Sequence, residues 1–402
     1  MRILMLSWEY PPHVIGGMGK HVMELAPALA ARGVEVHVVT PLLRNGARHE
    51  VTADGVHVHR ALAPAMEESS YTAFVRQSNQ GVEQAAAQVR REIGEISLIH
   101  AHDWLVTEAA IRLKHIWRRP LIATFHATER GRQQGHLHTG ASHEINALEW
   151  RLSYESWRLI ACSHFMGAQI RQYFDVPGDK IDIVPNAVHI TPDPFTSPEE
   201  RRAFRRRFAA DDQQLVFYVG RMVYEKGVQV LLEAWPQILA ACPNARLVIA
   251  GIGAFLDTAR SIAAGFGLTD TVMFAGFMSD EDRDRLYHVA DVATFPSLYE
   301  PFGIVALEAM AAGCPVVVSA TGGLSEVIEL HETGITVHPG SADSLAWGIQ
   351  HTLQHPDWSA QRAVQALRTV RERYNWGRVA EETRRVYQRV VELWRRGTWG
   401  RP

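Results

Sequence analysis

Residues 299–315 read YEPFGIVALEAMAAGCP and predict a helix that carries two carboxylates. Pro301 sits where a helix can begin without losing a hydrogen bond, and the final Gly-Cys-Pro supplies a stop signal. Glu300 stands just before the predicted helix of residues 301–312, and Glu308 lies inside it, eight residues later. At a rise of about 1.5 Å per residue, we expect Glu308 roughly 9–12 Å further along the axis.

The start of this predicted helix favours an anion. The amides of Phe302, Gly303 and Ile304 lack partners within a helix and, together with the helix dipole, point at whatever lies in front of them. One carboxylate beside a phosphate and another deeper suit a sugar nucleotide, which has hydroxyl groups on both sides of its diphosphate. The alternative interpretation is a buried structural helix with one solvated glutamate and one capping glutamate.

Length and composition describe a globular chain with more than one hydrophobic core. The 402 residues exceed one ordinary core, and 47% hydrophobic and 21% charged residues are typical of soluble proteins. The net charge of −3 gives no general preference for nucleic acid, and three cysteines are too few for a disulfide framework or a zinc site. The chain starts like a strand rather than a signal peptide, and no stretch is long enough for a membrane span. We therefore expect a cytoplasmic protein.

Strand and helix patterns alternate along the chain in two series. The alternation predicts a parallel sheet covered by helices in residues 1–190 and a second one in residues 213–375. Prolines and the run EERRAFRRRF mark residues 191–212 as a linker, and residues 376–396 have the apolar stripe of a terminal helix. We expect an α/β fold of two doubly wound, Rossmann-like domains that face each other across a deep cleft, where a ligand binds.

The segment VGRMVYEKG, residues 219–227, follows the first predicted strand of the second domain. Ligands gather at the carboxyl ends of such strands. Arg221 can fork onto phosphate oxygens and Lys226 adds a point charge, so the pair could hold a pyrophosphate and stabilise it as it leaves. The alternative is an ordinary surface Arg and Lys at a helix start. A later GIG segment mimics a dinucleotide fingerprint but lacks its third glycine, which argues against NAD.

The first domain has polar groups after three of its predicted strands. The loop SWEYPPHVIGGMGK contains Gly16 and Gly17, which would let backbone amides approach a phosphate or a sugar closely. Asp103 lies in HAHDW after a second strand, and His126 follows LIATF. Clustered His and Asp at strand ends indicate hydroxyl recognition or acid–base work. A metal site is the competing interpretation, but no spacing of the HExxH kind occurs.

Together these segments resemble the retaining GT-B glycosyltransferases of family four and the related bacterial glycogen and starch synthases, over nearly the whole chain. EPFG…LEAM matches the E-x7-E element of that superfamily, and GR…KG matches its donor-phosphate pair. WEYPPHVIGGMG, HAHDW, ATFHATERGR and VPNAV match its first-domain landmarks in order. The residues of WEYPP…GGMG and HAHDW are similar to those of the α-glucan synthase branch.

The resemblance implies a donor site in the second domain. Arg221 and Lys226 would neutralise the donor diphosphate, replacing the metal that other glycosyltransferases use. Glu308 would hold the nucleotide ribose. Glu300 would contact the transferring sugar, beside the amides at the start of the 301–312 helix. The resemblance therefore implies no cofactor and no metal.

The resemblance also implies roles for the first domain. His126 would contact the 6-hydroxyl of the sugar, and Gly16 and Gly17 would bring the backbone close to the donor phosphates. Asp103 and Glu9 would face the acceptor or the sugar. Transfer would retain the anomeric configuration, with the departing phosphate taking the proton of the acceptor. The terminal helix would cross back to the first domain, and the cleft would close on the donor.

The leading hypothesis is transfer of glucose from ADP-glucose or UDP-glucose to an α-glucan or a small sugar acceptor. Two departures from the family pattern are Val14, where glycogen and starch synthases carry Lys, and PNAVH in place of PNGVD. The alternatives are a lipid or cell-envelope acceptor, which the basic stretches 201–207 and 361–402 support, and a sugar-nucleotide-binding protein without turnover. No nucleic-acid partner is expected, and peripheral membrane contact is not favoured.

Overall fold

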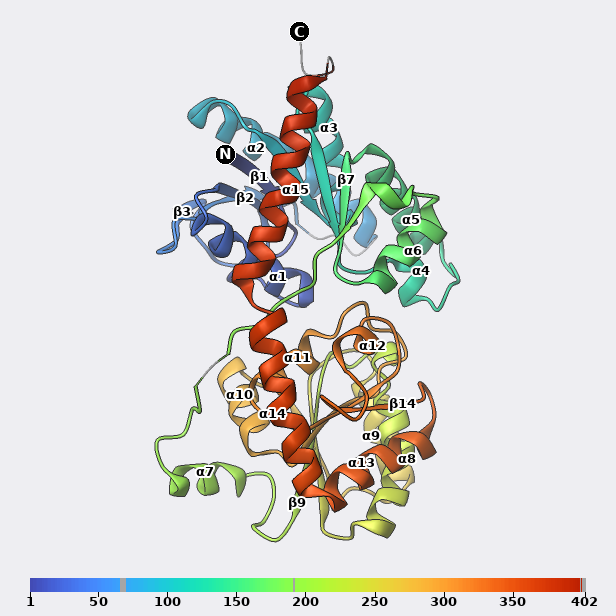
Figure 1. The fold of residues 1–402 in the computed structure, drawn as a ribbon. Helices are drawn as coiled ribbons and strands as arrows, with labels where there is room; N and C mark the ends of the chain where they lie inside the picture. The colour runs from blue at the N-terminus through green and yellow to red at the C-terminus, as the bar shows by residue number, and fades with distance from the viewer. Residues whose placement is uncertain (66–69, 191, 398, 400–402) are drawn as a thin grey trace. The chain divides into compact units, whose positions relative to one another are not determined.

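The computed structural model describes residues 1–65, 70–190, 192–397 and 399. The chain divides into two compact units, and Figure 1 labels their elements. The first unit contains Met1–Asn186 together with Trp376–Pro402, and the second contains Ala187–Asn375. Each unit has its own sheet.

The first unit is built on a mostly parallel sheet. Among the described residues its strands run in the order β3-β4-β2-β1-β5-β6-β7-β8, and only β3 pairs antiparallel to its neighbour. Nearly every residue of β1, β5 and β6 is buried, as expected for a parallel sheet with helices on both faces. The strands are β1 (Arg2–Leu6), β2 (Glu35–Leu42), β3 (His49–Val51), β4 (His57–Leu62), β5 (Leu98–His102), β6 (Leu121–Phe125), β7 (Arg158–Ala161) and β8 (Ile181–Ile183).

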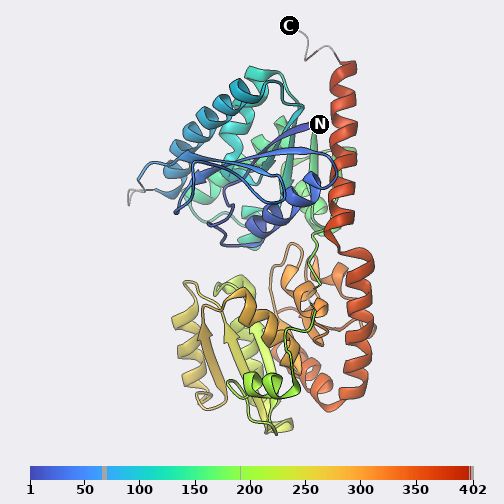
Figure 2. The same cartoon turned by 90° about the vertical axis from the view of Figure 1, so that its left-hand side faces the viewer.

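The last helix of the chain, α15 (Trp376–Arg396), belongs to this first unit. It packs against α1, and Figures 1 and 2 show it running beside that helix. On its buried side, the hydroxyl of Tyr387 hydrogen-bonds Nδ1 of His100 on β5 at 2.7 Å. The other helices are α1 (Gly17–Ala30), α2 (Tyr71–Ile93), α3 (Thr107–Trp117), α4 (Glu129–Arg132), α5 (Gly140–Glu155) and α6 (His164–Phe174), with 3-10 turns η1 (Trp104–Val106) and η2 (Gly178–Lys180).

The second unit is doubly wound around a parallel sheet. Its described strands run in the order β11-β10-β9-β12-β13-β14. They are β9 (Gln214–Val219), β10 (Ala245–Ala250), β11 (Val272–Gly276), β12 (Val292–Phe295), β13 (Val316–Ser319) and β14 (Ile335–Val337). The helices are α7 (Pro198–Arg205), α8 (Val228–Ala241), α9 (Leu256–Gly265), α10 (Asp280–Val289), α11 (Ile304–Ala311), α12 (Leu324–Val327), α13 (Ala342–Gln354) and α14 (Pro356–Arg373), with the 3-10 turn η3 (Tyr224–Lys226). No helix that the structure describes in either unit combines the length and hydropathy needed to cross a bilayer.

The stretch predicted as a linker, residues 191–212, belongs to the second unit. Apart from residue 191, which is outside the described residues, it contains α7, whose first turn is capped by the Ser197 side chain. Arg201 and Arg205 of α7 donate hydrogen bonds to the carbonyl oxygens of His288 and Val289, so α7 is attached to the end of α10.

The helix predicted to begin at Pro301 begins three residues later, at Ile304. Gly303 precedes α11 in a left-handed conformation, with a φ of 105°. A Cβ at Gly303 would lie 2.5 Å from Leu324 Cδ2, so both the backbone and the available space require glycine. Pro301 therefore lies in a loop. Glu308 is four residues beyond the start of the helix, about 6 Å along its axis.

We expect Tyr387→Phe to weaken the attachment of α15. His100 and Tyr387 are fully buried, and removing the hydroxyl leaves Nδ1 of His100 without this partner. A buried polar group left unsatisfied costs about 1–3 kcal/mol, so the free energy of unfolding measured by denaturant titration should fall by about that amount. Tyr154→Phe, at a tyrosine that is 69% exposed, is the matched control. Equal stability of the two variants would contradict this role.

Candidate functional site

In each unit the strand order reverses beside one strand. In the second unit β9 lies between β10 and β12, and in the first unit β1 lies between β2 and β5. Connections leave such a strand and its neighbour in opposite directions, and ligands bind at the carboxyl ends exposed there. The predicted site residues of the second unit follow β9 and β12, and several of those in the first unit follow β1 and β5.

A largely buried ion pair at the second-unit switch point joins Lys226 to Glu300. Lys226 Nζ lies 2.6 Å from Glu300 Oε2, and the two side chains are only 18% and 10% exposed. Gly227 makes the approach possible, because a Cβ there would lie 1.9 Å from the carbonyl oxygen of Pro296 after β12. The structure thus brings together two of the predicted residues, a cation and a carboxylate, from loops that are distant in sequence.

Arg221 lies in the loop between β9 and η3 and remains half-exposed. Its Nη2 is 3.7 Å from Glu225 Oε1, and 51% of its side chain is exposed. The GIG segment after β10 packs directly against this loop, since the amide of Met222 donates to the carbonyl of Ile252 at 2.9 Å. A Cβ at Gly251 would lie 1.8 Å from the carbonyl oxygen of Gly220. The segment that mimics a dinucleotide fingerprint therefore supports the Arg221 loop by close backbone packing.

Glu308 on α11 is held by a residue that sequence reasoning missed. Arg283 Nε on α10 lies 3.5 Å from Glu308 Oε2, and each side chain is 12% exposed. Arg283 also forms ion pairs with Asp280 and Asp284 on its own helix. Burial opposes the charge of this guanidinium, but Glu308 and the other acidic groups outweigh it and raise the pKa of Arg283. Arg283 thereby orients the carboxylate of Glu308.

The start of α11 is built by two close backbone contacts. The amide of Gly323 donates to the carbonyl of Glu300 at 2.9 Å, and a Cβ at Gly323 would lie 2.4 Å from Phe302 Cα. Hydrogen bonds of the helix begin only at Ala306, which donates to Gly303 at 3.0 Å. The helix thus opens at Ile304, four residues after Glu300 and later than expected, and anion binding by its first amides stays a prediction.

In the first unit Glu9 holds the glycine loop after β1. Its Oε2 accepts hydrogen bonds from the amides of Ile15 at 2.7 Å and Gly16 at 3.0 Å. A Cβ at Gly19 would lie 2.4 Å from the same oxygen. The predicted residues Glu9 and Gly16 are therefore joined by a hydrogen bond, and Gly17 follows as the first residue of α1.

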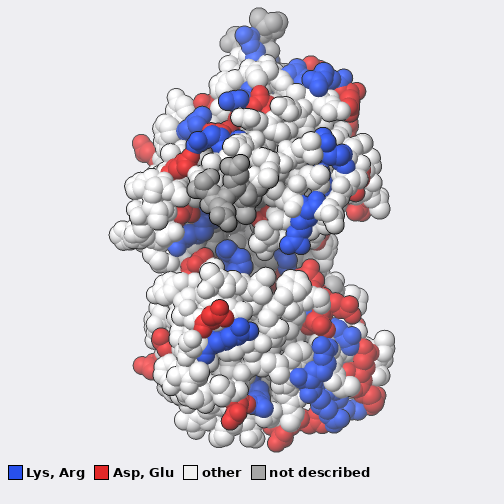
Figure 3. All heavy atoms as spheres, turned by 180° about the vertical axis from the view of Figure 1, so that it is seen from behind, with Lys and Arg blue, Asp and Glu red and all other residues white. Residues whose placement is uncertain are grey.

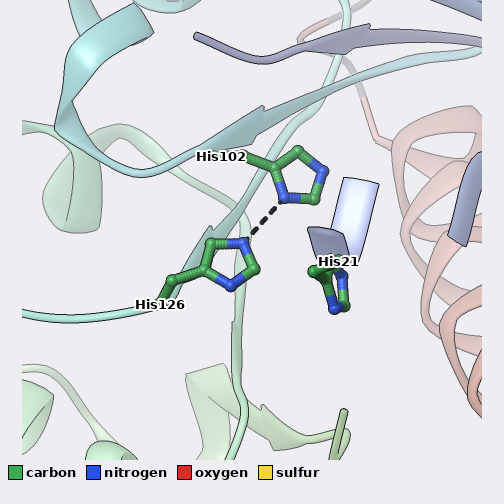
Figure 4. A group of neighbouring side chains, drawn as sticks. All are labelled: His21, His102 and His126. Carbon is green, nitrogen blue, oxygen red and sulfur yellow. Dashed lines mark hydrogen bonds between the residues drawn. The ribbon is translucent and has the colours of Figure 1, made fainter. Parts of the chain in front are cut away.

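Asp103 and His126 meet at the carboxyl ends of β5 and β6. Asp103 has a positive φ of 57°, and its Oδ1 accepts a hydrogen bond from the amide of His126 at 2.7 Å. Burial raises the pKa of Asp103 to about 6. His102, the last residue of β5, faces His126, with its Nδ1 3.1 Å from Nε2 of that ring (Figure 4). Asp103 thus fixes the backbone that carries His126.

His21 on α1 completes a group of three histidines with His102 and His126. One ring nitrogen from each lies within 4.8 Å of the others, and Figure 4 shows the rings gathered from three segments of the chain. Burial lowers the pKa of all three imidazoles below the usual range, so the rings are neutral at pH 7. The predicted cluster contained His102 and His126, but His21, a helical residue distant in sequence, was missed.

A second acidic group lies beside these residues and was also missed. Glu149 on α5 accepts hydrogen bonds from the amide of Glu129 at 2.8 and 3.1 Å, and Ser142 Oγ donates to Glu129 Oε1 at 2.9 Å. Arg132 reaches both carboxylates. Burial nevertheless raises the pKa of Glu149 to about 8, because it outweighs Arg132. No local sequence pattern signals this pair, since its members belong to different helices.

Two family models match the chain in succession. A model described as Glycosyltransferase Family 4 matches residues 15–191, and a model described as Glycosyl transferases group 1 matches residues 200–369. An uncharacterised glycosyltransferase of Methanocaldococcus jannaschii is 37% identical, covering 98% of this chain and 99% of the relative. Glycogen synthase of Mycobacterium tuberculosis is 35% identical, covering 96% of this chain and 94% of the relative.

Solved structures share the fold along the whole chain. Sucrose-phosphate synthase from Thermosynechococcus elongatus matches with a TM-score of 0.84 at 25% identity, covering 98% of this chain and 99% of that one. The catalytic domain of starch synthase IV from Arabidopsis thaliana, solved with ADP and acarbose, matches with a TM-score of 0.77 at 17% identity, covering 97% and 99%. At that identity the second likeness concerns the fold alone.

Glu149→Gln should change how stability depends on pH. Because the folded-state pKa is raised from 4.5 to about 8, the folded protein binds the proton more tightly, and stability falls as the pH rises through that window. At about 1.36 kcal/mol per pKa unit the loss is on the order of 4–5 kcal/mol. Glutamine keeps an acceptor for the Glu129 amide and cannot ionise. Denaturant titrations between pH 5 and about 8.5 should therefore show a smaller slope for the variant, and an unchanged slope would contradict a neutral Glu149.

Proposed function

Because the chain belongs to the family-four glycosyltransferases with the GT-B fold, we propose that it transfers glucose from ADP-glucose or UDP-glucose to an α-glucan or small sugar acceptor, with retention of configuration. The observation that carries the proposal is the Lys226–Glu300 pair at the switch point of the second unit, with Arg221 in the same loop. It offers two cations for a diphosphate and one carboxylate for a sugar hydroxyl.

Lys226 and Arg221 act on the departing nucleoside diphosphate. In the transfer step the bond between the anomeric carbon and the phosphate oxygen breaks, and the acceptor oxygen bonds to that carbon on the same face. The proton of the acceptor hydroxyl passes to the leaving phosphate. Negative charge develops on the diphosphate, so positioned cations stabilise the transition state more than the bound substrate. We assign no metal cofactor to this step.

Glu308 binds the ribose of the donor, and Arg283 positions Glu308 through their contact at 3.5 Å. An ionised carboxylate accepts hydrogen bonds from two neighbouring hydroxyl groups, which suits a ribose diol. Glu300 contacts the sugar next to the opening amides of α11. In this proposal the protein holds the nucleotide at α11 and its surroundings rather than through contacts to the base. ADP and UDP therefore remain alternatives.

The first unit supplies contacts to the transferred sugar and the acceptor. The neutral ring of His126 can donate one hydrogen bond and accept another, which matches a sugar hydroxyl. Asp103 positions it through the amide contact of 2.7 Å. The identity of 35% to a glycogen synthase and the likeness to a sucrose-phosphate synthase support glucose as the transferred sugar.

A lipid or cell-envelope acceptor has weaker support, because the basic run 201–207, at the end of α7 and just after it, is neutralised locally. Figure 3 shows basic and acidic side chains interleaved at the lower right, where α7 lies. The arginines of this run form ion pairs, namely Arg201–Asp193, Arg202–Glu199, Arg205–Asp291, Arg206–Asp211 and Arg207–Asp282. Binding to anionic vesicles at physiological salt would favour the membrane alternative.

Arg221→Ala and Lys226→Ala should each lower kcat about 10²–10³-fold, because the loss of one group that stabilises developing charge costs about 3–4 kcal/mol. The measurement is release of nucleoside diphosphate from a panel of sugar nucleotides, with α-glucans and small sugars as acceptors. Arg260→Ala is the matched control: its side chain is also 51% exposed and also pairs with a carboxylate on its own segment.

Normal turnover of both variants would contradict the proposed role of these cations. Absence of diphosphate release with every donor and acceptor would instead favour the binding protein without turnover. Lys226→Arg keeps the charge but not the compact ammonium group that contacts Glu300. Its turnover should lie between that of the wild type and that of Lys226→Ala.

Arg283→Met should raise the KM for the donor about tenfold and change kcat less. Without Arg283 the carboxylate of Glu308 loses its orienting partner, and ribose binding contributes similarly before and during transfer. Arg285→Met is the control, since Arg285 lies on the same helix but pairs with Glu200 and Glu281. If Arg283→Met and Arg285→Met have the same KM for the donor, the proposed positioning role of Arg283 is wrong.

A further inference from the structure

Three histidine side chains converge in the first unit without a carboxylate among them. His21 comes from α1, His102 ends β5, and His126 follows β6. The ring centroids lie 5.6 Å apart for His21 and His102, 4.8 Å for His21 and His126, and 5.4 Å for His102 and His126. A candidate ligand nitrogen of each ring lies within 4.8 Å of the other two. The three rings thus lie next to one another (Figure 4).

The hydrogen bonds around the group leave lone pairs inside it. Nδ1 of His21 contacts Oδ1 of Asn186 at 2.6 Å, and because an amide oxygen only accepts, Nδ1 bears the proton and Nε2 has a lone pair. In the hydrogen bond between His102 Nδ1 and His126 Nε2, 3.1 Å apart, one nitrogen donates its proton and the other accepts it. The accepting nitrogen therefore has a lone pair. Asn186 resembles the outer partner that commonly orients a metal-binding imidazole.

Hydrogen bonding within the protein does not satisfy all of this group. His102 is fully buried, and its Nε2 has no hydrogen-bond partner among the described residues. Metal binding through Nδ1, the nitrogen that faces His126, would leave the ring proton on this Nε2.

The spacing of the rings is close to that of a tetrahedral metal site. Two nitrogens bound at about 2.0–2.1 Å to one tetrahedral ion are about 3.3 Å apart. The nitrogens of His102 and His126 are already 3.1 Å apart, and the nitrogen of His21, which lies within 4.8 Å of them, needs a shift of at most about 1.5 Å. Three imidazoles with no carboxylate favour zinc and its neighbours over magnesium or calcium.

We propose that His21, His102 and His126 bind one divalent transition-metal ion of the zinc class, with the fourth position open to water or a hydroxyl group. Three protein ligands and one open position form a known type of metal site. A consequence, which rests on the proposed function, is that the ion and the sugar compete for His126. The metal would then inhibit transfer reversibly and would not be a cofactor.

Other histidines of the chain could also bind such ions and must be removed from the experiment. His351 and His355 stand one helical turn apart at the end of α13, with ring centroids 4.5 Å apart, an arrangement that chelates divalent ions at protein surfaces. The double variant His351→Gln/His355→Gln therefore serves as the background. Both histidines lie in the second unit, outside the proposed donor and sugar contacts, so the turnover of this double variant should equal that of the wild type.

Titration of cobalt(II) into this metal-free background tests the proposal. We expect about one equivalent of bound ion with the intense visible absorption of four-coordinate cobalt, and displacement of the cobalt by zinc. Adding His21→Gln to the background should weaken binding at least tenfold. Asn186→Ala, which removes only the outer partner, should weaken it about 10–100-fold. Thermal unfolding of each variant shows whether it is folded.

Absence of four-coordinate cobalt absorption in the background would overturn the proposal, as would unchanged binding in a folded His21→Gln variant. This readout needs no turnover and is therefore independent of the proposed function. In the transfer assay, micromolar zinc should lower turnover and a chelator should restore it. Zinc binding without any effect on turnover would overturn the competition for His126.

Discussion

The reversal of strand order beside β1 and β9 is the constraint on which the rest of the structure depends. Crossover connections between parallel strands lie on one face of the sheet or the other, and where the winding direction changes, the carboxyl ends of two adjacent strands are left uncovered. At β9 and β12 this brings Lys226 to Glu300, and in the first unit the glycine loop and Asp103 follow the adjacent strands β1 and β5. The same topological rule, applied twice, selects which loop residues can meet.

Close backbone contact then sets the local geometry of the second unit. Gly227 allows the Lys226 turn to touch the backbone at Pro296, and Gly251 allows the next loop to touch the backbone at Gly220. Both contacts exclude any Cβ. The likeness of the GIG segment to a dinucleotide fingerprint has the same origin. The glycines of this segment and those of a dinucleotide fingerprint both allow loops to pack tightly at the carboxyl ends of a parallel sheet. Such packing requires glycine whatever ligand is bound.

Sequence periodicity predicted what depends on neighbouring residues. The terminal helix expected at residues 376–396 is α15 with the same bounds, and the alternation of strands and helices predicted two parallel sheets. The predicted start of α11 was wrong because the proline signal favoured Pro301. In the structure Gly303 has a left-handed backbone and packs closely on Leu324, and the helix begins only after it. The contact of Arg283 with Glu308 depends on tertiary structure, and no spacing along the chain reveals it.

The buried imidazoles connect the two proposals through one property, their neutrality. A neutral ring can donate and accept hydrogen bonds, which suits a sugar hydroxyl, and it can give a lone pair to a metal. The bond between His102 and His126 already uses one donor and one acceptor. A metal that binds both nitrogens must replace the proton between them and draw in His21, and a sugar hydroxyl that binds Nε2 of His126 must also replace this hydrogen bond. The two ligands make incompatible demands on the same nitrogen, and competition between them follows from the proton inventory of the rings.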